Sequence, residues 1–188
     1  MIAAAGPLQA SDRSHDIVAQ QQFGSGGKVE VELTSGAYVI AGTDSDSIAV
    51  TYGCDSPRAL RQVKVNINTT GSTARITVAD TPQSNFHAVI ELPRRSALWV
   101  RLTAGDLRIE GLQGDKDIEG NAGNIEVEVP HPDEYGHRDA SVLAGDLDAS
   151  VFNISTGGLL RSFRQNGPGK YRLHAHLMAG NISYIEGN

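Results

Sequence analysis

Two stretches of this chain hold the residue types that could bind a metal ion. The first is "PHPDEYGHRD", residues 130–139, whose candidate ligands are His131, Asp133, Glu134, His137 and Asp139. Imidazole nitrogens and carboxylate oxygens bind divalent cations when the chain holds them in a fixed geometry. Two prolines and a glycine interrupt the stretch. We therefore expect an exposed connection between strands and not a metal site.

The second stretch is "KYRLHAHLMAG", residues 170–180. Alternation places its apolar side chains on one face of a strand and three polar ones on the other, namely Arg172, His174 and His176. Two histidines on one face would bind a metal only if a neighbouring strand added a ligand. We expect the polar face of a half-buried strand, and the sequence predicts no metal and no cofactor.

Carboxylates that could hydrolyse a glycan occur on two consecutive predicted strands. The charged positions are Asp106, Arg108 and Glu110, followed by Glu126 and Glu128. A glycosidase needs two carboxylates about 5 Å or more apart, but charges on an outward strand face also keep a sheet soluble. Trp99 is the single tryptophan, which weakens the case for an aromatic sugar subsite. We expect no enzyme; a carbohydrate-active enzyme and a metal-dependent binding module remain the alternatives.

Charge and motifs exclude further classes of function. The net charge of −6 and the pI of 5.4 disfavour nucleic-acid binding, which depends on clustered Lys and Arg. The pair Arg94 and Arg95 is interpreted as a solvated strand end. Cys54 is the single cysteine, so no internal disulfide forms. The stretch "GSGGK" at 24–28 lacks the spacing of a phosphate loop, and no apolar run is long enough to span a membrane.

Period-2 alternation identifies the elements that must position these residues. In "KVEVELTSGAYVIAG" the side chains of Val29, Val31 and Leu33 share one face of a strand. Further strands are predicted at 47–51, 62–67, 74–78 and 87–92, and no segment has a convincing helical repeat. Residues 1–27 are polar and glycine-rich, so we expect a flexible N-terminal lead, followed by a β-strand-repeat domain over 28–188.

A repeated tetrad is the main organising signal. Four copies read Ala-Gly-(Asp/Asn)-(Leu/Ile) and begin at Ala104, Ala122, Ala144 and Ala179; two relatives begin at Ser35 and Thr156. Across each copy the apolar spacing changes from two to three. Glycine permits a sharp turn, and Asp or Asn beside it can hydrogen-bond locally. The tetrads are therefore predicted to be corners that keep both flanking strands facing one core.

Regularly spaced corners favour one fold class. We predict an all-β, single-domain β-solenoid or β-roll of stacked strands with Gly-Asp/Asn corners; the alternative is an antiparallel β-sandwich whose hairpins use Gly-Asp. The corner side chains Asp106, Asn124, Asp146 and Asn181 alternate charged and neutral groups along the sequence. That alternation suits stacked hydrogen bonds at the corners better than calcium capture.

Three stretches resemble a known family. They are "GGKVEVELTSGAYVIAGTDSDSIAV", "VIELPRRSALWVRLTAGDLRIEGLQGDKDIEGNAGNIEVEV" and "GKYRLHAHLMAGNISY", within residues 22–188. They are similar to the bacterial "putative-adhesin" family, which is built of Gly-Asp-Val-type β-strand repeats and has no assigned function. The resemblance implies a parallel-coil β-fold in an exported or envelope-associated protein. It carries no catalytic residue to this chain.

The expected function is non-catalytic binding. We predict a structural or adhesin-like protein of the bacterial envelope whose partner is an envelope protein or glycan. Outward polar rows such as Arg108, Glu110, Glu126 and Glu128 would contact that partner. The expected location is extracytoplasmic, from the resemblance and because "MIAAAGPLQA" is similar to the small-residue end of a cleaved export signal.

Overall fold

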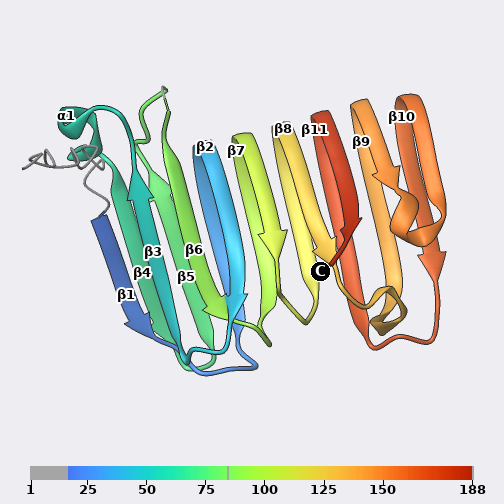
Figure 1. Ribbon diagram of the computed structural model, residues 1–188, viewed down its shortest axis with the longest axis horizontal. Helices are drawn as coiled ribbons and strands as arrows, with labels where there is room; N and C mark the ends of the chain where they lie inside the picture. Colours follow the sequence, from blue (N-terminus) through green and yellow to red (C-terminus); the bar gives the residue numbers. More distant parts are fainter. Residues whose placement is uncertain (1–16, 84, 188) are drawn as a thin grey trace, which may run out of the picture.

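Eleven strands form one large mixed sheet in the computed structural model, which describes residues 17–83 and 85–187 (Figure 1). The strands are β1 (Ile17–Gln22), β2 (Lys28–Thr43), β3 (Ser47–Gly53), β4 (Lys64–Thr70), β5 (Thr73–Ala79), β6 (His87–Pro93), β7 (Ala97–Glu110), β8 (Lys116–Val129), β9 (Tyr135–Ala149), β10 (Ile154–Asn166) and β11 (Tyr171–Glu186). The helical elements are α1 (Pro57–Leu60) and two 3-10 turns, η1 (Pro132–Glu134) and η2 (Ser150–Phe152). The fold is all-β, as predicted.

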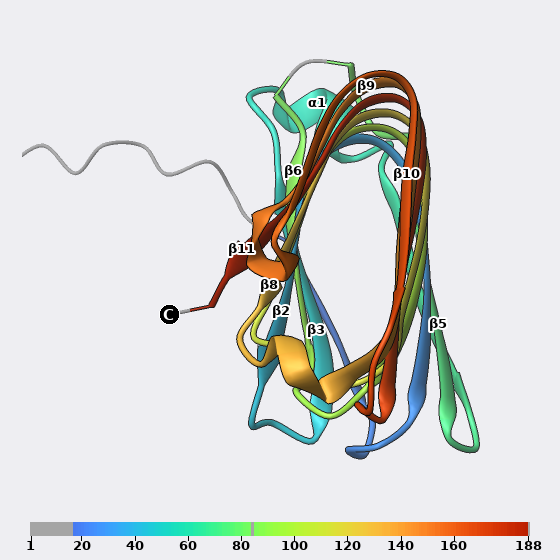
Figure 2. The same cartoon turned by 90° about the vertical axis from the view of Figure 1, so that its right-hand side faces the viewer.

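The long strands bend in the middle, so the sheet folds over a central core. Figure 2 shows the two halves facing each other, joined at the bend. We call the halves the first arm, before the bend, and the second arm, after it. β2 is the branch point: its first half pairs with β5 and its second half with β6, while β7 pairs with both halves. The sheet does not close on itself.

Glycine makes the bend possible. Gly36, Gly105, Gly123, Gly180 and Gly145 lie in one register across β2, β7, β8, β11 and β9. A Cβ atom placed on Gly123 would lie 1.8 Å from the carbonyl oxygen of Gly105, and its φ of +127° is one that side chains rarely allow. At these five glycines the backbones approach too closely for a side chain, which fits the predicted role of their tetrads as corners.

The order of strands in space differs from their order in sequence. β7 and β8 pair in parallel, but β11 lies between β8 and β9, parallel to both. β10 then pairs with β9 in antiparallel fashion. The identical tetrads of β8 and β11 therefore become neighbours, with Ala179 opposite Ala122 and Asn181 opposite Asn124.

Apolar side chains from both arms meet in one core. In β7 the residues Leu98, Val100 and Leu102 face it from the first arm, and Leu107 and Ile109 face it from the second. Each such side chain contributes about 1.5–3 kcal/mol when fully buried. An aromatic cluster lies near the β10 end of this core, where Phe152, Phe163 and Tyr184 pack with ring centroids 5.7–6.3 Å apart.

The predicted strands at 47–51, 62–67, 74–78 and 87–92 are confirmed as β3 to β6. The predicted lead, residues 1–27, is described from residue 17 onward. There the chain forms β1, which pairs with β3, and Phe23 packs into the core. Sequence alternation missed β1 because an edge strand rich in glutamine is held by backbone hydrogen bonds and not by an apolar face. In the described ranges, no helix has the length and apolar character needed to cross a bilayer.

Among the residues whose burial is described, the core contains one buried charged side chain, that of Lys116. Lys116 is 1% exposed, and its Nζ donates hydrogen bonds to the carbonyl oxygen of Leu112, at 3.0 Å, and to the hydroxyl of Tyr135. The same ammonium lies 4.7 Å from the centre of the Tyr135 ring. Burial lowers the pKa of Lys116 from 10.5 to about 8, because a low-dielectric environment disfavours the charged form.

We expect Gly123→Ala to destabilise the fold by about 3 kcal/mol or more, because the new Cβ meets the Gly105 carbonyl. The matched control is Gly71→Ala, where φ is also positive, at +59°, but nothing lies within 4 Å of the new Cβ. That control should cost about 1–2 kcal/mol. Chemical denaturation measures both, and equal losses would show that the close backbone contact at Gly123 does not cause the loss of stability.

We expect the wild-type protein to gain stability between pH 8 and pH 10.5. In that window the unfolded Lys116 still holds its proton and the folded one has lost it, so the unfolding free energy rises with pH. The shift corresponds to about 3 kcal/mol. Lys116→Met should remove most of this rise, whereas Lys28→Met, at an exposed position, should keep it. An identical pH profile for wild type and Lys116→Met would contradict the assignment.

Candidate binding surfaces

The outward charged residues predicted as a contact surface lie together on the second arm. Arg108 and Glu110 come from β7, and Glu126 and Glu128 come from β8, and the register places Arg108 beside Glu126. We call these four residues the second-arm surface. Arg108 Nε donates to Glu110 at 2.9 Å, and Arg108 Nη1 donates to Glu126. Glu128 accepts a hydrogen bond from the backbone N–H of Gly111 at 3.1 Å.

These contacts hold the four side chains on the outer face of the second arm, where Arg108 is exposed and the three glutamates are half-buried. The hydrogen bond to Glu110 is the largest cause that raises the pKa of Arg108, and the charges of Glu126, Glu110 and Glu128 add to it. Three carboxylates and one guanidinium leave the surface with a net negative charge. It can offer acceptors to hydroxyl, amide or cationic groups of a partner.

The corner side chains form a hydrogen-bonded ladder. Asn124 Nδ2 donates to Asp106, and Asn181 Nδ2 donates to Asn124, both at 2.8 Å. The backbone N–H of Asp146 donates to Asn181 at 3.0 Å, and Arg161 donates to the carboxylate of Asp146 at 2.7 Å. The spatial order is Asp, Asn, Asn, Asp, which corrects the alternation inferred from sequence order. The insertion of β11 between β8 and β9 produces this change.

The histidines and acids of residues 130–139 do not form one loop. His131 is exposed and Asp133 and Glu134 belong to η1, but His137 and Asp139 lie on β9, which begins at Tyr135. The expectation of a loop through residue 139 is wrong, because Tyr135 is buried and starts the strand. Asp139 contacts two imidazoles: His137 Nε2 lies 3.1 Å from one carboxylate oxygen, and His174 Nδ1 lies 2.5 Å from the other.

The polar face predicted for residues 171–177 is confirmed on the first arm. His174 and His176 point outward from β11, and β9 supplies the partner of each. His176 Nδ1 lies 2.7 Å from Ser141 Oγ, so both imidazoles bind to polar side chains of the neighbouring strand. In the described part of the chain, no three His, Cys, Asp or Glu residues are arranged to hold a metal ion.

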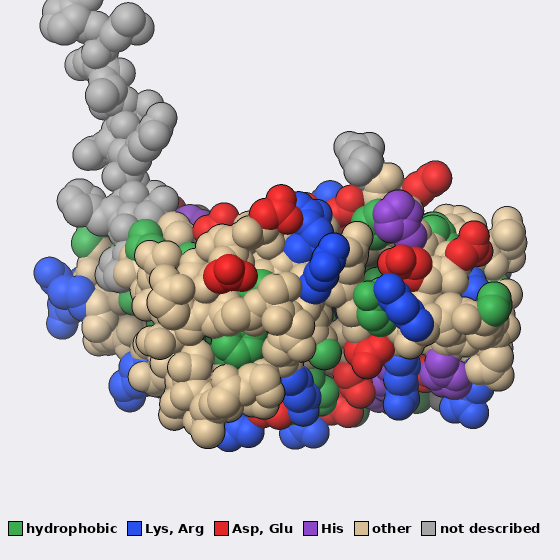
Figure 3. All heavy atoms as spheres, turned by 90° about the horizontal axis from the view of Figure 1, so that it is seen from below, with side chains coloured by type: hydrophobic (Ala, Val, Ile, Leu, Met, Phe, Trp, Pro, Cys, Tyr) green, Lys and Arg blue, Asp and Glu red, His purple; other side chains and the backbone are tan. Residues whose placement is uncertain are grey.

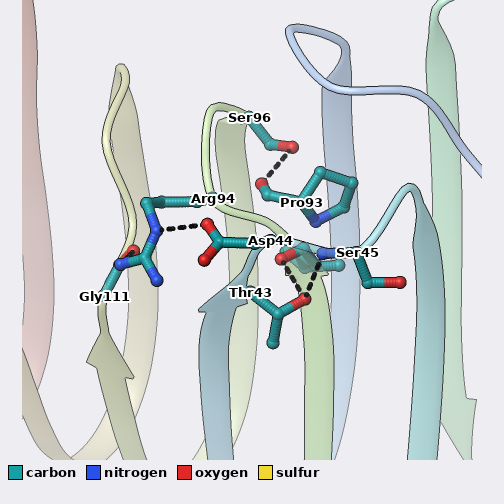
Figure 4. A network of polar contacts seen from close by, with 8 residues as sticks. Thr43, Asp44, Ser45, Pro93, Arg94, Ser96 and Gly111 are labelled. Atoms are coloured by element: carbon teal, nitrogen blue, oxygen red, sulfur yellow. Dashed lines mark hydrogen bonds and ion pairs between the residues drawn. The ribbon is translucent and has the colours of Figure 1, made fainter.

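A second polar network lies where the strands end, near the predicted solvated pair Arg94 and Arg95. Figure 4 shows Arg94 directed toward Asp44 and Gly111. Its Nε donates to Asp44 at 3.0 Å and its Nη1 donates to the Gly111 carbonyl at 3.2 Å. Arg94 therefore joins the loops after β2, β6 and β7. Seen from this end, charged side chains of both signs are interspersed on the surface (Figure 3).

The outer face of the first arm has a hollow that the sequence did not predict. Its volume is about 550 Å³, and it lies over β5, β2, β7 and β8, which are neighbours in the sheet (Figure 1). Small polar side chains line it, including Thr34, Thr103 and Asn121, beside the longer Glu32, Arg101 and Glu119. The alternation of the sequence predicts that these side chains point away from the core. Their meeting at one level depends on the register of parallel strands, which the sequence does not give.

Comparison with known proteins finds a solved structure of similar fold. No protein-family model and no curated protein sequence matches the chain. A solved "putative cell adhesion protein" from Clostridium sporogenes is similar over 90% of this chain and 99% of its own, with 11% identity and a TM-score of 0.57. "Putative adhesins" from Parabacteroides merdae and Parabacteroides distasonis cover 93% and 92% of this chain and 79% and 71% of their own. Their identities are 8% and 11%, and their TM-scores are 0.32 and 0.29. The bent, glycine-cornered sheet of this chain thus has the fold of the clostridial adhesion protein.

Proposed function

We propose that this chain is a non-catalytic, adhesin-like binding protein of the bacterial cell envelope. The observation that carries the proposal is the in-register stacking of five parallel strands, which aligns outward polar side chains into rows on a rigid support. Such rows suit recognition of an extended partner better than enclosure of a small molecule. The fold shared with the clostridial adhesion protein supports the same role.

We also propose how the bent strands are arranged in three dimensions. We treat the bent strands as coils of a β-solenoid, with residues 28–188 as the repeat domain and β1 added from the preceding lead. In-register glycine corners favour this view over a sandwich of antiparallel hairpins, in which corners need not align. The extracytoplasmic location is proposed on the same likeness of fold.

A carbohydrate-active enzyme is the alternative. It would use carboxylates such as those of the second-arm surface. There Arg108 donates a hydrogen bond to Glu110 and another to Glu126, so both carboxylates are already paired with a cation. This pairing favours binding over hydrolysis.

We expect alanine replacement of all four residues of the second-arm surface to weaken binding to isolated bacterial envelopes at least tenfold. The reason is that their acceptors and the Arg108 guanidinium provide the directional contacts on this arm. Co-sedimentation of purified protein with envelopes measures the affinity. The fold should persist, because exposed ion pairs contribute about 0–1 kcal/mol each.

The control replaces Lys64 and Asp80 with alanine. They form an exposed ion pair of 2.7 Å at the β4 to β5 hairpin, away from the second arm. Equal binding by the quadruple variant and this control would refute the role of the second-arm surface. Release of cleaved sugars from the envelopes would favour the enzyme instead.

A further inference from the structure

We infer that the outer face of the first arm holds a binding site for an uncharged oligosaccharide, which would lie across the strands. The inference rests on the proposed binding function, but it names a different face and a ligand class. The site follows one residue on each of β2, β7, β8, β11 and β9, namely the residue directly before the in-register positions Ser35, Ala104, Ala122, Ala179 and Ala144. We call them the threonine row: Thr34, Thr103, Asn121, Met178 and Leu143.

At the larger hollow the side chains of the threonine row are shorter than those of the neighbouring level. The outward level before it holds Glu32, Arg101 and Glu119, whose longer side chains rise beside the small ones. This difference produces the hollow of about 550 Å³ over β5, β2, β7 and β8. A second hollow of about 240 Å³ is lined by Leu143, Ser141 and His176 farther along the sheet. Met178 lies on β11, the strand between β8, which lines the larger hollow, and β9, which lines the second.

Arg101 is held in place before any ligand arrives. Its Nε lies 3.2 Å from the carboxylate of Glu119, and its guanidinium carbon lies 4.9 Å from the centre of the Trp99 ring. Thr34 is fixed in the same way, because its hydroxyl lies 2.9 Å from that of Thr81 and also donates to the Val78 carbonyl. Groups that are already ordered lose little conformational entropy on binding.

The chemistry of the row matches a sugar chain. Threonine hydroxyls and the Asn121 amide can donate to and accept from sugar hydroxyls, the two carboxylates can accept from them, and the Arg101 guanidinium can donate to them. Met178 and Leu143, which are 48% and 46% exposed, offer apolar contacts to the C–H faces of sugar rings. The positions repeat at the spacing of neighbouring strands, about 4.8 Å. An extended chain of pyranose rings can therefore place successive units over successive strands.

Charge disfavours an anionic ligand. Glu32 and Glu119 outnumber Arg101 in the larger hollow, and the whole chain carries a net charge of −6. A polyanion such as a sulfated glycan or a nucleic acid would be repelled. A protein partner would need a broader apolar centre than the two exposed side chains of this row.

Titration of the purified protein with cellohexaose and chitohexaose, followed by calorimetry, tests the inference. We expect saturable binding of at least one of them and at least tenfold weaker binding of a heparin hexasaccharide. Thr103→Arg should fill the middle of the larger hollow and weaken the binding at least tenfold. Thr70→Arg adds the same side chain at an exposed position on β4, outside the row, and should leave binding unchanged. Thermal melting confirms that both variants fold.

The outcomes separate the two proposals. If neither neutral oligosaccharide binds, or if heparin binds more tightly, the inferred ligand class is wrong. Continued adhesion to envelopes would then leave the proposed function standing, with a protein partner favoured. Unchanged oligosaccharide binding by Thr103→Arg would refute the site. Oligosaccharide binding without adhesion to envelopes would support the site and refute the envelope role.

Discussion

Contact between neighbouring backbones at the bend is the constraint on which this structure depends. At Gly105, Gly123, Gly180 and Gly145, a Cβ atom would lie within 1.7–1.9 Å of a carbonyl oxygen on the adjacent strand. Only glycine fits such an approach, and each glycine also holds a φ that other residues avoid. The bends therefore stack directly on one another. Their alignment determines the register of every strand that passes through them.

That register creates the surfaces. Because the strands are parallel and unshifted at the corner, residues at equal distance from the glycine meet across the sheet. The same rule brings Asn124 beside Asp106 and Asn181, Arg108 beside Glu126, and Asp139 beside His174. Inward positions form the core by the same geometry. A substitution that shifts one strand by one residue would disrupt the core, the ladder and both outer faces together.

Many polar side chains of the outer faces bind one another. Arg108, His174, His176 and the asparagines of the ladder each have a partner on the neighbouring strand. This pairing makes the faces well ordered, and it explains why pairs of metal-binding residue types occur here without a metal geometry among the described residues.

Lys116 differs from these outward polar residues because it lies in the core. Its charge lies inside the core, where a hydrogen bond to Tyr135 and one to a carbonyl only partly offset the cost of burial.

The sequence by itself determined most of the strands and the positions of the glycine tetrads, since alternation and the tetrads are local signals that need no knowledge of neighbours. It also determined which residues face outward, as Arg172, His174 and His176 show. Only the tertiary structure decided which strands are adjacent. β11 inserts between β8 and β9, which reorders the ladder, brings His174 to Asp139 and assembles the threonine row. Strand order depends on contacts between residues far apart in the chain. Identical tetrads on several strands could not distinguish one neighbour from another.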